Sequence, residues 1–134
     1  MLSTSSIEEL GTTRPDLYAF RVQGEVSRAD MTEMARRMKK AFDAHDQVDM
    51  LLYFEGFEGS APDAGLDFDT LKSQRGSLSP VRRYVVANAP ERAEKIVEAF
   101  GKALPVDAEA YDSLYDAFKS LGAKSMTVTG QPAA

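Results

Sequence analysis

The run Val-Asp-Met-Leu-Leu-Tyr-Phe-Glu, residues Val48–Glu55, is the longest apolar stretch of the chain and decides its fold. A short apolar run bounded by turn signals is typical of a strand that is buried on both faces. Strands of this kind occur in largely parallel sheets that helices cover. We therefore expect an α/β domain with Val48–Glu55 as a central strand.

A hairpin and a helix are predicted before this strand. Ser6–Leu10 and Leu17–Val22 have strand character and are separated by a turn, which favours an antiparallel hairpin. Ser27 is placed to cap a helix, with Asp30 three residues later as in a capping box. The apolar stripe of that helix is Met31, Met34, Ala35, Met38, Ala41 and Phe42. A helix between two strands predicts a parallel crossover.

After the central strand we expect an irregular loop over Gly56–Gly65, followed by alternating helices and strands. The expected elements are a short helix over Leu66–Ser77, a strand over Arg83–Ala87, a third helix with Pro90 in its first turn, an edge strand over Val106–Tyr111, and a final helix capped by Asp112 or Ser113 that carries Leu114, Tyr115, Phe118 and Leu121. The fold class is thus α/β, with a mostly parallel mixed sheet of four or five strands, an N-terminal antiparallel hairpin and about four helices.

Composition indicates a single domain over residues 1–134, with its core at about residues 6–121 and a flexible tail over 122–134. The net charge of −5, with basic residues interleaved among acids, argues against nucleic-acid binding. No stretch approaches the length of a membrane span, and the N-terminus lacks the features of a secretory signal. With no cysteine in the chain, these features lead us to expect a cytoplasmic protein.

No catalytic constellation is visible, so we expect a protein that is not an enzyme and that needs no cofactor. Ser60 lacks the Gly-x-Ser-x-Gly context of a nucleophile, and the only histidine, His45, is expected at the opposite end of the central strand. The acids from Glu55 to Asp69 lack EF-hand spacing, and we interpret them as a solvated surface rather than a metal site.

Aromatic residues cluster in sequence around the central strand and the loop after it. They could simply close the core, or they could line an apolar pocket between sheet and helix. Under the second interpretation, the ligand-binding residues are Phe54, Phe57, Leu66, Phe68, Leu71 and Tyr84.

The order of elements resembles the SpoIIAA-like family of STAS-related bacterial domains. The resemblance is carried by Leu51–Gly59, Phe68–Lys72, Arg83–Ala87, the helix around Lys95–Phe100, and the hairpin that ends in Gly24. It implies a compact cytoplasmic domain with helices packed on a sheet, and some relatives have been discussed as having an apolar cavity between the two.

The resemblance leaves two functions open. One is a non-enzymatic binding module for a lipid-like or apolar small molecule; the other is a STAS-type regulatory module that docks a protein through loop 56–65 and the following helix. STAS antagonists of anti-sigma factors carry an Asp-Ser-x-Gly phosphorylation site after the central strand. Ser60 lies in the corresponding loop, but its neighbours Gly59 and Ala61 depart from that motif. The sequence also allows a homodimer, because the short first strand leaves a sheet edge to be covered.

Overall fold

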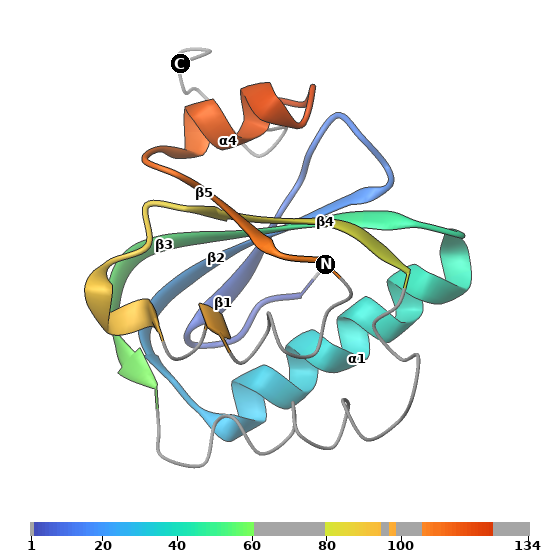
Figure 1. The fold of residues 1–134 in the computed structure, drawn as a ribbon. Helices are drawn as coiled ribbons and strands as arrows, with labels where there is room; N and C mark the ends of the chain where they lie inside the picture. The colour runs from blue at the N-terminus through green and yellow to red at the C-terminus, as the bar shows by residue number, and fades with distance from the viewer. Residues whose placement is uncertain (1, 61–79, 95–96, 99–105, 125–134) are drawn as a thin grey trace.

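The computed structural model describes residues 2–60, 80–94, 97–98 and 106–124, which form a five-stranded mixed sheet of order β1-β2-β3-β4-β5 (Figure 1). The strands are β1 Ile7–Leu10, β2 Leu17–Val26, β3 Val48–Ser60, β4 Val81–Ala87 and β5 Ala108–Tyr111. β1 is antiparallel to β2, and all other neighbouring pairs are parallel. The predicted hairpin, crossover and central strand are confirmed.

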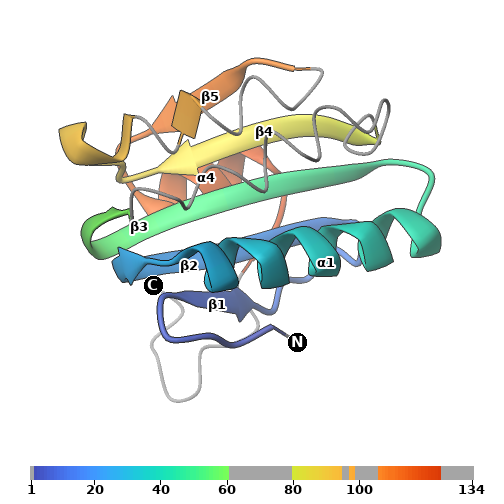
Figure 2. The ribbon, with the colours of Figure 1, turned by 90° about the horizontal axis from the view of Figure 1, so that it is seen from below.

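Helix α1, Arg28–Ala44, covers one face of the sheet (Figures 1 and 2). The Ser27 side chain accepts a hydrogen bond from the Asp30 N–H, so this helix begins where the sequence predicted. Its methionines, Met31, Met34 and Met38, are each 1% exposed and pack against the alternate β3 residues that face this side. The apolar stripe of α1 is therefore a core-packing face.

Helix α4, Leu114–Ser120, lies on the opposite face (Figures 1 and 2). Ser113 caps it by accepting a hydrogen bond from the Asp116 N–H. Ala117 and Phe118 pack on Leu51 and Val85 in a second, smaller apolar cluster. Because Met50 and Leu52 point to the α1 side while Leu51 points to the α4 side, β3 is buried on both faces, as its sequence predicted.

The helix content differs from the prediction of about four helices. Over the described residues, the helices with assigned bounds are two α-helices, α1 and α4, and one 3-10 helix, η1 Glu91–Ala93; Glu94 and residues 97–98 are also helical. The third predicted helix thus begins as η1 behind Pro90. The helix expected over Leu66–Ser77 lies outside the described residues.

The predicted loop over Gly56–Gly65 is wrong in its first half, because β3 continues to Ser60. The ladder between β2 and β3 shifts register on both sides of Gly24, so β3 contains extra residues there. Gly56 and Gly59 absorb these bulges at φ values of +66° and +125°, which side-chain-bearing residues rarely adopt. Gly56 and Gly59, which suggested a loop, are therefore bulge residues inside a long strand.

The outer edge of β1 is partly covered by the chain's own beginning. Ser3 pairs with Glu8 in an antiparallel bridge, and the Glu9 N–H donates to the Leu2 carbonyl at 2.9 Å. These contacts cover part of the sheet edge at which the sequence had allowed a homodimer.

Candidate functional site

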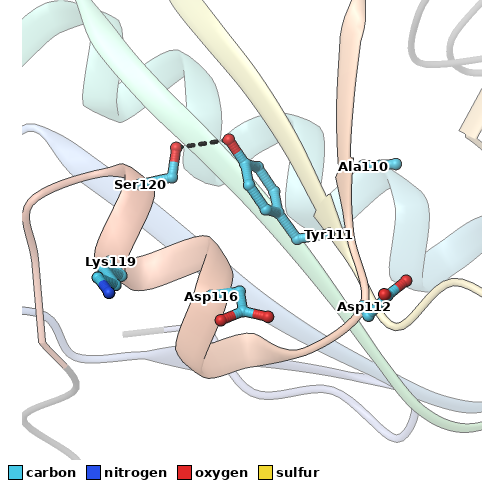
Figure 3. A pocket seen from close by; sticks show the side chains of 6 residues that line it. All are labelled: Ala110, Tyr111, Asp112, Asp116, Lys119 and Ser120. Carbon is cyan, nitrogen blue, oxygen red and sulfur yellow. Dashed lines mark hydrogen bonds between the residues drawn. The ribbon is translucent and has the colours of Figure 1, made fainter.

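An open pocket of about 430 Å³ lies between the end of β5 and helix α4 (Figure 3). Its lining is polar and consists of Ala110, Tyr111, Asp112, Asp116, Lys119 and Ser120. The pocket is formed where a strand at the end of the sheet order leads directly into the capped helix that covers one face.

Both walls of the pocket are anchored to the sheet. The Asn88 N–H, at the end of β4, donates to the Tyr111 carbonyl at 2.9 Å and holds the end of β5 in place. Phe118 and Leu121, 6% and 4% exposed, fix α4 on the sheet through its buried side. The surface above them therefore has a fixed shape.

A hydrogen-bonded network forms the inner side of the pocket. The hydroxyl groups of Tyr111 and Ser120 lie 2.6 Å apart (Figure 3). Arg83 Nη2 also donates to Ser120 Oγ at 2.7 Å. Arg83 also donates to both carboxylate oxygens of Glu109, at 2.9 and 2.6 Å. The hydrogen bond from Arg83 lowers the pKa of Glu109, so this pair is charged and internally matched at neutral pH.

The outer side of the pocket carries carboxylates of a different kind. Asp112 and Asp116 are exposed, and within the described part of the chain neither carboxylate forms an ion pair or a side-chain hydrogen bond. Beside them on α4, Tyr115 is 62% exposed and is the one large hydrophobic residue that is exposed among those described. Unpaired charge and an exposed aromatic ring are features that suit binding of a partner.

Among the described residues, the pocket places no general base at the hydroxyl group of its serine. Ser120 is its only hydroxyl-bearing residue besides Tyr111, and its hydroxyl contacts a guanidinium, which is a hydrogen-bond donor and not a base. His45 lies at the end of α1, where its ring is 6.0 Å from that of Tyr18. Within the described residues, no group of three or more histidine, aspartate or glutamate side chains could hold a metal ion.

The residues predicted to bind an apolar ligand fall into two groups. Phe54, Phe57 and Tyr84 lie in the α1-side core and are 1%, 5% and 0% exposed. Leu66, Phe68 and Leu71 lie outside the described residues. The β3 bulge brings Phe57 to the same face as Phe54, where their rings meet edge to face at 5.3 Å.

The phenol of Tyr84 is accommodated within this core. Its hydroxyl donates to the Val97 carbonyl at 3.1 Å, and burial raises its pKa. Ser60, the predicted phosphorylation site, is the last residue of β3, and its backbone pairs with Val26. A ligand at the aromatic residues and a phosphate on Ser60 both remain predictions.

The pocket beside α4 was not predicted from the sequence, where Tyr115 was grouped with Leu114, Phe118 and Leu121 on the final helix. The buried positions are Ala117, Phe118 and Leu121, while Tyr115 projects into solvent. The spacing of the apolar residues could have indicated that Tyr115 is exposed. Leu114, Phe118 and Leu121 are four and three residues apart, so they share one face of the helix. Tyr115 follows Leu114 by one position and therefore lies off that face.

Comparison with known proteins identifies the class to which this fold belongs. A sequence profile of the SpoIIAA-like family matches residues 17–119, and the chain belongs to that family. A crystal structure of an uncharacterised protein of the DUF3478 family with a SpoIIAA-like fold, from Shewanella loihica PV-4, aligns with a TM-score of 0.62 at 18% identity. The alignment covers 90% of this chain and 99% of that one.

A search of curated proteins finds no match. In the described residues, none of the helices has the length and apolar character needed to span a membrane. The SpoIIAA-like fold thus gives the architecture and suggests a binding or regulatory module.

Proposed function

We propose that this chain is a non-enzymatic binding module that docks a protein partner on the surface formed by α4 and the end of β5. The observation that carries the proposal is the open pocket beside the exposed ring of Tyr115. Tyrosine is enriched among residues that dominate binding energy, because it buries a large area with little loss of side-chain freedom. The SpoIIAA-like fold supports the general class of module.

The proposal is also supported by the way in which the surface is held. Arg83 donates to the Ser120 carbonyl at 3.1 Å, and Arg14 donates to the Leu121 carbonyl at 2.9 Å. These bonds satisfy carbonyl groups at the end of α4 and suit the negative end of its dipole. A partner would therefore meet a preformed surface and would lose little affinity to ordering it.

Site-specific photo-crosslinking in the native host tests this proposal. A photo-reactive phenylalanine analogue is placed at Tyr115, at Glu58 or at Asp43, all exposed positions on different parts of the molecule. We expect a discrete crosslinked partner from Tyr115 and none from Asp43. The adduct should disappear when Asp116→Arg is introduced beside the probe, because that change reverses the charge of the pocket rim.

Crosslinking from Glu58 instead of Tyr115 would favour docking near residues 56–65, the surface expected from the STAS resemblance. The exposed position of Glu58 on the extended part of β3 makes this a direct comparison. Equal adducts from all three positions, or no adduct from Tyr115, would refute docking at α4.

An apolar small molecule is a second candidate ligand, favoured by the meeting of Phe54 and Phe57 in one aromatic contact near the end of β3. Because these rings and Tyr84 are buried, such a ligand would have to share the core with them. Native mass spectrometry of the purified protein should then show a bound mass that solvent extraction removes. If the protein shows only the mass of the bare chain, both in native lysate and after purification, this candidate is excluded.

A further inference from the structure

We infer that the partner anchors itself by placing an arginine side chain in the pocket between β5 and α4. This inference rests on the proposed docking function and specifies its chemistry. The charges of the rim, the ring of Tyr111 and the size of the pocket support it.

The carboxylates around the pocket differ in whether their charge is already matched. Glu109 is bound by both nitrogens of the Arg83 fork, whereas Asp112 and Asp116 have no cationic partner within the described residues. Lys119 also lines the pocket, three residues after Asp116, yet the two side chains form no ion pair. The rim therefore carries two carboxylates against one ammonium, and a cationic group from a partner would restore the balance.

The ring of Tyr111 provides a second recognition element. Its hydroxyl is held at 2.6 Å from Ser120, so the ring has a fixed direction from β5 toward α4 (Figure 3). A guanidinium stacks on an aromatic face and also presents a flat set of donors to a carboxylate. The same combination occurs elsewhere in this chain, where Arg37 lies 5.1 Å from the ring centre of Tyr18 and binds Glu9.

Arginine fits this arrangement better than lysine or a free small cation. A planar guanidinium both stacks on aromatic rings and binds carboxylates, while an ammonium makes point contacts and loses more hydration. A volume of about 430 Å³ accommodates one such side chain with part of its backbone. We expect Asp116, which projects from α4, to accept the guanidinium, with Asp112 on the rim adding long-range attraction.

A titration by NMR tests the inference without knowledge of the partner. The probes are three blocked pentapeptides of glycine with a central arginine, glutamate or leucine, added to the isotope-labelled full chain. We expect saturable amide shifts at residues 110–112, 116 and 119–120 with the arginine peptide alone. The arginine peptide should bind about fivefold more weakly to Asp116→Asn, because one charge-assisted contact is lost.

Asp46→Asn is the matched control, because Asp46 is also an exposed aspartate but lies between α1 and β3. It removes the same charge and should leave the affinity unchanged. Similar shifts from the leucine or glutamate peptide, shifts away from the pocket, or equal weakening by both variants would overturn the arginine anchor.

The crosslinking experiment separates this result from the docking proposal. A partner that crosslinks to Tyr115 and tolerates Asp116→Asn as well as Asp46→Asn would leave docking at α4 intact and refute the arginine anchor. If no partner crosslinks to Tyr115 at all, docking itself is refuted, whatever the peptides do.

Discussion

Different interactions hold the helices on the two faces of this sheet. On the α1 side, large side chains such as Phe20, Phe54 and Met34 are at most 1% exposed and form one extended apolar cluster. On the α4 side, the apolar cluster contains four alanines, and arginines around it bind carboxylates as well as the carbonyl groups at the end of α4. Apolar burial stabilises the first face in proportion to area, whereas the second face depends on charged contacts in fixed geometry.

A buried carboxylate organises the α4 side. Asp49, whose side chain is 2% exposed, accepts hydrogen bonds from Arg82 at 3.1 Å and pairs with Arg14 at 2.9 Å. Arg14 in turn donates to the Leu121 carbonyl just after α4. The position of the binding surface is therefore linked to a charge on the central strand. We expect the stability of the α4 face, which carries the proposed binding surface, to respond more strongly to loss of charge than that of the α1 face.

The largest expected effect comes from breaking the α1 side. Phe20→Ala should lower the free energy of unfolding by about 3–5 kcal/mol, because it leaves a cavity where a fully buried ring had been. Urea denaturation followed by circular dichroism measures the change. Phe42→Ala, at a half-buried position on α1, should cost clearly less, and equal losses would contradict the expectation that the loss follows the burial of the ring.

Breaking the charged side should have the next largest effect. Asp49→Ala should cost about 2–3 kcal/mol, since Arg14 and Arg82 lose the carboxylate between them but remain partly hydrated. Hydrogen exchange should show lost protection in α4 before α1. A uniform loss across both helices would show that the two faces are not separable units.

Acid should reveal a charged pair on the α1 side, which is the contact of Glu9 with Arg37 at 2.6 and 3.0 Å. Burial alone would raise the pKa of Glu9, but hydrogen bonds from Arg37 and the Leu2 N–H outweigh it and leave the pKa below its usual value. A carboxyl with a lowered folded-state pKa contributes stability above its unfolded pKa, about 4.3, and loses it as the pH falls through the folded value.

The matched variant is Glu9→Gln, which should lower the free energy of unfolding by about 1–2 kcal/mol at pH 7. Its stability should change less between pH 5 and 2 than that of the unmodified chain, so that the two curves converge in acid. Parallel curves would show that the Glu9 pair contributes no pH-dependent stability.

The smallest expected effect is that of Tyr115→Ala on stability. The side chain is 62% exposed, so the free energy of unfolding should change by no more than about 0.5 kcal/mol. The same change should weaken capture of a partner at α4. A loss of stability comparable to that of Asp49→Ala would indicate that Tyr115 is part of the folded core and not a free binding residue.

Much of the fold followed from local patterns. The cap at Ser27, the methionine stripe and the central strand were predictable because periodicity and capping depend on neighbours within a few residues. The extension of β3 to Ser60 was not, because Gly56 and Gly59 signal a turn unless a neighbouring strand pairs across them. That pairing with Gly24 and Val26 involves residues more than thirty positions away.

The candidate site was predictable only in part. Phe54, Phe57 and Tyr84 were grouped from their positions around the central strand, and the structure places all three in one core cluster, while their binding of a ligand stays a prediction. Tyr111 and Ser120 were not singled out, because each is an ordinary residue until a hydrogen bond joins the end of β5 to α4. Arg83 reaches Ser120 across a separation of 37 residues.

The sequence by itself determined the α/β class, the central strand and the apolar faces, since hydrophobic burial leaves a periodic mark along the chain. Only the tertiary structure decided which charges meet. Asp16, Asp49 and Arg82 form one network because β2, β3 and β4 start side by side. Charged residues follow no periodic pattern along the sequence, and strand order and register decide which of them meet. The surface proposed here for binding is therefore a product of how the elements pack.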